Sequence, residues 1–204
     1  MDILGVDEAG RGSVLGPLVI AGVIVPEKMN KVLERMGVKD SKKLAPHRRT
    51  ILSRKLKKMF EWEIVVITAR DIDNMRAEGI NLNDIEKNAM EELILKLNPE
   101  KAIVDAVDVK AERFQDKLCK STGVDVIAEH KADDKYIEVS AASIIAKQER
   151  DSFIDEINKE YIGMGGIGSG YPSDPTTKKF LTNFTYDEMP DFVRRSWATV
   201  DKMK

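Results

Sequence analysis

The sequence predicts an α/β protein with a five-stranded mixed sheet flanked by helices. Two apolar runs near the start, residues 4–6 and 18–25, are separated by a short glycine-containing stretch, which is typical of an antiparallel strand pair. After them, β-branched runs alternate with segments of helical periodicity, which favours a mixed sheet with helices on both faces. The three further strands are expected at residues 63–68, 102–104 and 124–128.

Three segments carry the signals of longer helices. Pro46 is placed to be the first residue of one that runs to about residue 60. Apolar residues spaced by four predict a second helix over residues 84–97. A third, over residues 137–161, has an apolar side made by Ile144, Ile145, Phe153, Ile154 and Ile157.

The chain has 204 residues, enough for one domain or one domain with a small appendage. Five glycines fall between residues 163 and 170, a composition typical of a flexible connection. We therefore expect a main domain over residues 1–162 and a small C-terminal helical extension over residues 163–204.

Composition excludes several classes of protein. No run approaches the ~20 apolar residues of a membrane span, so no membrane partner is expected. The first residues show no secretion signal, and the single cysteine, Cys119, excludes a disulfide framework or a cysteine-rich zinc site. These features predict a cytoplasmic protein, and we expect a monomer.

The net charge of −2 hides a local imbalance. Residues 39–58 contain nine basic residues and one acid, Asp40. A polyanion-binding surface and an ordinary solvated helix face explain this segment about equally well when it is taken alone.

Four acids are the candidates for chemistry: Asp7, Glu8, Asp105 and Asp133. Asp7 and Asp105 close apolar strands, where a carboxylate must be paired or must bind a cation. Few basic residues lie nearby in the sequence, so a hard divalent cation with oxygen ligands is expected. Taken alone, Asp133 or Asp108 is better explained as a helix cap or turn residue, whereas adjacent acids at a strand end gain little from capping.

Other reactive residue types give weaker signals. An ordinary hydrogen bond explains His130 at least as well as catalysis does, and Cys119 is expected to be a packing residue. Gly10-Arg11-Gly12 directly follows the acids at positions 7 and 8, where glycines would let a ligand approach the backbone and the arginine could hold a phosphate. A plain turn explains this tripeptide about as well.

Together, these motifs make the chain resemble ribonuclease HII, the type 2 ribonucleases H, and in particular its archaeal members. The resemblance runs through nearly the whole chain in the order of the family. It rests on residues 7–12 with Gly16-Pro17, 40–44, 104–105, 130–133, 141–147, 168–175 and 194–197.

The resemblance implies a ribonuclease H-like fold and a nuclease that cleaves the RNA strand of RNA/DNA hybrids. It also implies incision at ribonucleotides embedded in duplex DNA, leaving 5′-phosphate and 3′-hydroxyl ends. Some archaeal relatives end in a peptide that binds the sliding clamp. This chain ends at Asp201-Lys202-Met203-Lys204 without that pattern, so a clamp partner is not expected.

Residue roles follow from the same resemblance. Asp7, Glu8, Asp105 and Asp133 would be the catalytic carboxylates, holding two Mg²⁺ or Mn²⁺ ions with Asp7 as the bridging ligand. Tyr171 would pack on the deoxyribose after the RNA–DNA junction. The remaining substrate contacts would be Gly10, Arg11 and Gly12 at the ribose and its phosphates, and Lys42, Lys43, Ser143 and Lys147 at phosphates.

Three other functions are compatible with parts of this pattern: a metal nuclease for another structure such as a DNA junction, a nucleic-acid-binding module without catalysis, and a small-phosphoester hydrolase. Four retained acids argue against the binding module. The basic segment at residues 39–58 and the lack of a P-loop favour a polymeric substrate.

Overall fold

A computed structural model describes all 204 residues, and these form two compact units. The first unit contains residues 1–9, 19–65 and 83–148. The second contains residues 10–18, 66–82 and 149–204. Each unit is described separately below; the domain boundary expected at residues 162/163 stays a prediction.

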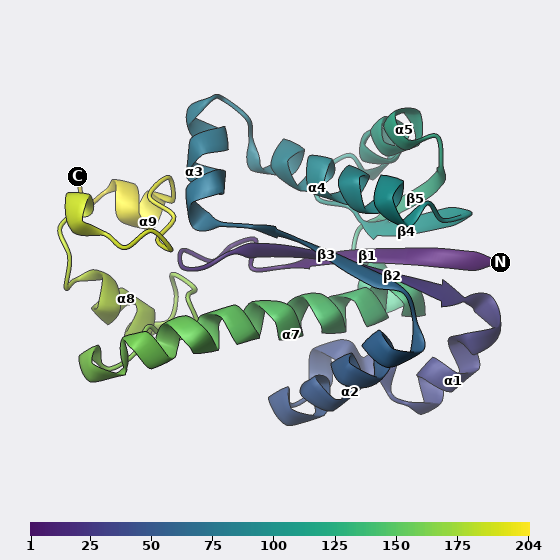
Figure 1. Ribbon diagram of the computed structural model, residues 1–204. Helices are drawn as coiled ribbons and strands as arrows, with labels where there is room; N and C mark the ends of the chain where they lie inside the picture. Colours follow the sequence, from purple (N-terminus) through teal and green to yellow (C-terminus); the bar gives the residue numbers. More distant parts are fainter. The chain divides into compact units, whose positions relative to one another are not determined.

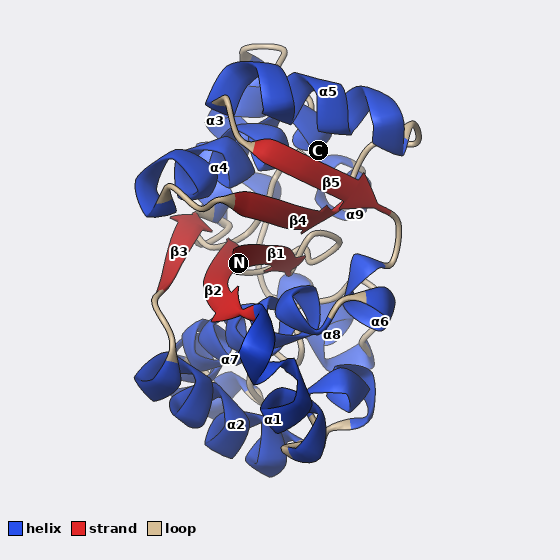
Figure 2. Ribbon diagram, turned by 90° about the vertical axis from the view of Figure 1, so that its right-hand side faces the viewer, coloured by secondary structure: helices blue, strands red, loops and turns tan.

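The first unit is built on a five-stranded sheet with the strand order β3-β2-β1-β4-β5 (Figure 2). β1 is antiparallel to β2, while β4 runs parallel to both β1 and β5. The strands are β1 (Asp2–Ala9), β2 (Leu18–Pro26), β3 (Trp62–Ile67), β4 (Lys101–Asp105) and β5 (Asp125–Glu129).

Helices cover both faces of this sheet (Figures 1 and 2). α4 (Leu82–Leu97) and α5 (Ala111–Thr122) lie on one face. The other face packs on α1 (Asn30–Arg35), α2 (Pro46–Met59) and the first half of α7 (Ile137–Glu160), with alternate β2 residues such as Val23 in the shared core. The one-turn helix α6 (Ala132–Lys135) precedes α7. The fold class expected from the sequence, a mixed five-stranded sheet between helices, is therefore confirmed.

Gly5 allows α7 to approach the centre of β1. A Cβ atom at position 5 would lie 2.1 Å from the carbonyl oxygen of Glu138 and 2.6 Å from the nitrogen of Val139. Both contacts are with helix backbone, which cannot rotate away as a flexible side chain can. The start of α7 is thus seated directly against the strand that carries Asp7.

The second unit gathers segments from distant parts of the sequence around one apolar core. Val14 and Leu15 pack with Phe180 and Val193 in this core. Aromatic rings meet edge to face within it, with Tyr161 and Phe180 centred 5.1 Å apart. Its helices are α3 (Ala69–Ala77), the part of α7 from Glu149 onward, α8 (Pro175–Leu181) and α9 (Ala198–Asp201).

Two differences from the sequence-based expectation have clear physical reasons. Residues 10–18, placed between two strands in the sequence, belong to the second unit because Val14 and Leu15 supply part of its core. Phe153, expected on the apolar side of the helix over residues 137–161, is 38% exposed. Its neighbour Ile154, expected on the same side, is buried, because adjacent residues of a helix point in different directions. None of the helices combines the length and apolar character needed to cross a bilayer.

Gly5→Ala should destabilise the protein severely, by more than about 3 kcal/mol, since the new methyl group has no space against the α7 backbone. Thermal unfolding measures the effect. Gly163→Ala is the matched control, because a Cβ atom there meets nothing within 4 Å. Equal melting temperatures for both variants would contradict the close approach of α7 to β1.

Candidate active site

Asp7 lies near the end of β1, the central strand of the sheet. Side chains alternate along a strand, so Asp7 shares a face with Gly5, on the side covered by α7, while Glu8 points to the other face. The Asp7 side chain is buried, with 5% of its surface exposed. Its Oδ1 accepts a hydrogen bond of 2.8 Å from the backbone nitrogen of Glu8.

Asp105 is brought level with Asp7 by the parallel register of β1 and β4. Val6 pairs with Val104, so the next residues along the two strands, Asp7 and Asp105, are neighbours on the same face. Oδ1 of Asp105 accepts a 3.0 Å hydrogen bond from the backbone nitrogen of Lys131. This bond fixes the turn after β5, in which Lys131 has the left-handed φ of 56°.

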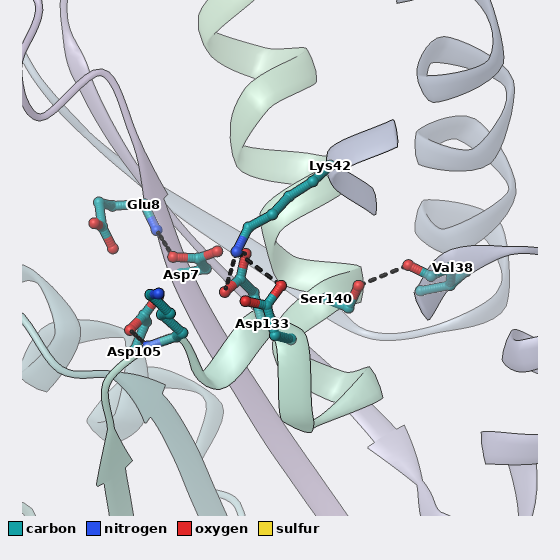
Figure 3. Close-up of polar contacts among 9 residues, drawn as sticks. Asp7, Glu8, Val38, Lys42, Asp105, Asp133 and Ser140 are labelled. Carbon is teal, nitrogen blue, oxygen red and sulfur yellow. Dashed lines mark hydrogen bonds and ion pairs between the residues drawn. The ribbon is translucent and has the colours of Figure 1, made fainter. Parts of the chain in front are cut away.

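Asp133 follows that turn, in the first turn of α6, and is buried with 7% of its surface exposed. It meets Lys42 from the 3-10 helix Val38–Lys43, whose Nζ lies 3.1 Å from Oδ2 of Asp133 and 2.8 Å from Asp134. Ser140 on α7 holds the start of that 3-10 helix by donating a 2.6 Å hydrogen bond to the carbonyl of Val38. Figure 3 shows these contacts beside Asp7, Glu8 and Asp105.

The carboxylates in this cluster repel one another. Burial, followed by the charges of Glu8 and Asp105, raises the pKa of Asp7 well above its usual value. Burial and the nearby Asp133 also raise the pKa of Asp105. Lys42 is the cation bonded to the cluster, and its pKa is raised by its hydrogen bonds to Asp134 and Asp133. The sequence-predicted acids are thus brought together, and they carry an excess of negative charge.

The donor set fits a hard divalent cation. It consists of carboxylate oxygens with no cysteine or histidine, the ligand chemistry that Mg²⁺ and Mn²⁺ prefer. A bound cation would also offset the repulsion that raises the pKa of Asp7. In the arrangement described, no three acidic, histidine or cysteine side chains are close enough to ligate one ion, and Asp133 is held by Lys42.

The other predicted contacts in the first unit are spread more widely. Lys43 is largely exposed and lies 3.6 Å from Asp40. Lys147 is half-buried on α7, and Ser143 is almost fully buried there. Asp108 has a structural role, because Arg113 binds it through two nitrogens and the backbone nitrogen of Lys110 donates to it.

His130 and Cys119, the other reactive residues in the sequence analysis, lie outside the cluster. His130 is exposed, and its Nε2 lies 3.2 Å from the carbonyl oxygen of Val109. Cys119 is half-buried with its sulfur 3.6 Å from the carbonyl of Val126. Both contacts are of the ordinary structural kind.

The predicted ribose-binding residues lie together in the second unit. Gly10 has a φ of 86° and is buried, Arg11 is half-buried, and Gly12 is exposed. Tyr171 is 37% exposed and its ring lies 4.9 Å from the guanidinium of Arg150. If Gly12 had a Cβ atom, it would lie 4.0 Å from the Tyr171 ring, so the glycine loop and the tyrosine are neighbours.

Comparisons with known proteins identify the family and agree with this fold. The sequence model of the Ribonuclease HII family matches residues 4–200. Ribonuclease HII of Methanobrevibacter smithii is 81% identical over 204 residues, covering 100% of this chain and 99% of that one. Ribonuclease HII of Methanothermobacter thermautotrophicus is 56% identical over 205 residues, with full coverage of both.

Solved structures give the same result. The crystal structure of ribonuclease H2 from Pyrococcus horikoshii has a TM-score of 0.91 and 40% identity, covering 100% of this chain and 97% of that one. The RNase HII in a PCNA complex from Archaeoglobus fulgidus has a TM-score of 0.88 and 42% identity, covering 97% and 95%. A Bst-RNase HIII structure with Mn²⁺, 19% identical with a TM-score of 0.79, covers 100% of this chain and 69% of that one and shares the fold.

The fold is that of a ribonuclease H-like protein. The chain belongs to the ribonuclease HII family. It is therefore a ribonuclease H, a metal-dependent endoribonuclease that acts on RNA/DNA hybrids.

Asp7→Asn should raise the melting temperature at pH 8, because it removes a buried charge that its neighbours repel. Since the pKa of Asp7 is raised on folding, ionised Asp7 costs stability above that pKa and costs none at pH values below the unfolded pKa of 3.8. We expect a gain of about 2–4 °C, the shift for 1 kcal/mol in a chain of this size, that disappears toward pH 4.

Asp108→Asn is the control of opposite sign. Arg113 lowers the pKa of Asp108, so its ionised form stabilises the fold and the substitution should lower the melting temperature at pH 8. Asp7→Asn would speak against a repulsive cluster if it also lowered the melting temperature at that pH.

Proposed function

We propose that this ribonuclease HII incises duplex DNA at embedded ribonucleotides as well as cleaving the RNA strand of hybrids, leaving 5′-phosphate and 3′-hydroxyl ends. The observation that carries the proposal is the cluster of Asp7, Glu8, Asp105 and Asp133 at the end of the central strands. Its excess negative charge suits cations that in turn bind a phosphodiester. Ribose recognition also requires a surface that can contact the 2′-hydroxyl and the sugar. The glycine loop, Gly10 to Gly12, together with Tyr171 would supply it.

Asp7, Glu8, Asp105 and Asp133 are the proposed catalytic residues, and they would hold two Mg²⁺ or Mn²⁺ ions, with Asp7 contributing to both. When bound, two such ions would supply an activated water and neutralise the leaving 3′-oxygen. Burial keeps Asp7 in place at the centre of the cluster. The backbone nitrogen of Lys131 donates a hydrogen bond to Oδ1 of Asp105, which fixes the position of this carboxylate.

Lys42 has two roles in this proposal. Its ammonium holds Asp133 and Asp134 before a cation is bound, which limits the repulsion within the cluster. Because its side chain is half exposed, it can turn toward a phosphate of the substrate once a divalent cation satisfies Asp133. Lys43, and Ser143 and Lys147 of α7, would add further phosphate contacts.

Recognition of ribose is assigned to backbone groups of Gly10, Arg11 and Gly12. Backbone amides can donate to the oxygen of the 2′-hydroxyl and backbone carbonyls can accept from its O–H, both at fixed geometry. These groups do not contact base edges. Tyr171 would pack on the sugar that follows the junction, since its ring is partly exposed beside Gly12. Little sequence preference follows from this arrangement.

The remaining proposals concern localisation, oligomeric state and domain organisation. We propose a cytoplasmic monomer whose catalytic domain spans residues 1–162 and whose C-terminal extension spans residues 163–204.

Asp7→Asn should reduce cleavage of a duplex with one ribonucleotide below about 1% of wild type in Mg²⁺ or Mn²⁺, while binding of that duplex persists. A strand-nicking assay and a binding titration measure the two quantities. An all-DNA duplex of the same sequence should stay intact with the wild-type protein. Cleavage of that duplex, or substantial activity of the variant, would refute the proposed site or substrate.

Lys42→Met should strengthen Mn²⁺ binding about two- to fivefold, because the lysine competes with a cation for Asp133. It should also lower the salt dependence of nucleic-acid affinity by about one unit of slope. Calorimetric titration with Mn²⁺ and binding at several salt concentrations test both effects. Lys39→Met, at an exposed position in the same 3-10 helix, should leave Mn²⁺ affinity unchanged; equal effects would remove Lys42 from the site.

A further inference from the structure

Two arginines are buried side by side in the second unit without forming a salt bridge. Arg194 has 0% of its surface exposed and Arg150 has 5%. Arg194 Nη2 and Arg150 Nε are buried without a hydrogen-bond partner. Buried guanidinium groups are costly when no carboxylate neutralises them, so their retention calls for a physical reason.

All the acceptors of Arg194 side-chain hydrogen bonds lie in one loop. Its Nε donates to the carbonyl of Gly16 over 3.1 Å, and its Nη1 donates to the carbonyl of Arg11 over 3.0 Å. Its own backbone nitrogen donates to the carbonyl of Val14 over 2.9 Å. One residue near the C-terminus thus fixes three points of the loop that contains the proposed ribose-binding glycines.

Arg150 fastens the same loop from α7. Its Nη2 donates to the hydroxyl of Ser13 over 2.6 Å and to the carbonyl of Ser169 over 3.0 Å. Its guanidinium lies 4.9 Å from the centre of the Tyr171 ring. Gly10 makes room for it, because a Cβ atom there would lie 2.5 Å from Arg150 Nε.

The charge of the pair is also retained. Burial and the positive charge of Arg150 lower the pKa of Arg194 to about 9, so Arg194 is still a cation at pH 7. Two like charges beneath one loop repel each other, and an anionic ligand on that loop would relieve the repulsion. A phosphodiester that flanks the bound ribose is such an anion.

We propose that Arg150 and Arg194 are positioning residues for ribose recognition, an inference that rests on the proposed function. They hold the carbonyls of Arg11 and Gly16 and the hydroxyl of Ser13 in one conformation, so that the backbone of Gly10 to Gly12 is pre-arranged for the 2′-hydroxyl. Arg150 sets the position of Tyr171 beside it. Because both guanidinium groups are buried, they act on the nucleic acid through the loop and not by direct contact.

The test compares affinities for two duplexes of identical sequence, one with a single ribonucleotide and one entirely of DNA, in EDTA so that no divalent ion supports cleavage. Arg194→Met should reduce the ratio of the two affinities about tenfold. Arg194→Lys should reduce it by less, because its ammonium keeps the charge and can donate to one carbonyl, although it cannot span both. The slope of affinity against salt should be unchanged, since no phosphate contact is lost.

Arg195→Met is the matched control. Arg195 lies next in the chain, but its side chain donates to the carbonyl of Met189 and packs on Tyr186, away from the loop. It should keep the wild-type ratio. Ser13→Ala, a small change, should lower the ratio in the same direction as Arg194→Met, and it keeps the test decisive should the arginine variants not fold.

Two results would overturn the inference. An unchanged ratio in Arg194→Met and Ser13→Ala, with both affinities falling together, would mean that the arginines only stabilise the fold. A salt slope lower by about one unit would mean that Arg194 contacts a phosphate directly. If the wild-type protein itself shows no preference for the ribonucleotide, the proposed function fails instead, which separates the two conclusions.

Discussion

The parallel pairing of β1 with β4 places two carboxylates, Asp7 and Asp105, side by side at the end of the sheet's central strands. The register that pairs Val6 with Val104 fixes this placement, because side chains at equivalent positions of neighbouring strands share a face. Asp133 joins them through the turn that Asp105 itself holds by its hydrogen bond with Lys131. The strand register therefore determines the positions of these two acids. The start of α7 packs against the same strand through its close contact at Gly5.

This arrangement stores electrostatic cost in the folded protein. Burial and neighbouring charges raise the pKa of Asp7, while Lys42 offsets part of the repulsion through its ion pairs with Asp133 and Asp134. The second unit shows the same principle with the opposite sign, in the buried pair Arg150 and Arg194. In each unit, side chains of like charge are held close together, and a ligand of opposite charge would relieve their repulsion. Such sites bind a charged ligand more strongly at the expense of the stability of the unliganded protein.

Several residues show why side-chain chemistry alone does not identify a role. Asp108 follows a strand end much as Asp105 does, yet it is neutralised by Arg113 and serves the local structure. Lys42 was expected at a phosphate and is found on Asp133. Arg194 carries no sequence signal beyond its motif, and its importance comes from carbonyls nearly 180 residues earlier in the chain. Such contacts depend on distances that only folding creates.

The sequence by itself determined the five strands, the main helices and the identity of the acids, since periodicity, β-branching and charge act locally along the chain. It also carried the family motifs, and the match of the family's sequence model to residues 4–200 confirms the family. Only the tertiary structure decided that Asp105 lies beside Asp7, that residues 10–18 join a core with the C-terminal segment, and that buried arginines support the glycine loop. These outcomes depend on strand register and on packing between distant segments, and neither is encoded in any short stretch of residues.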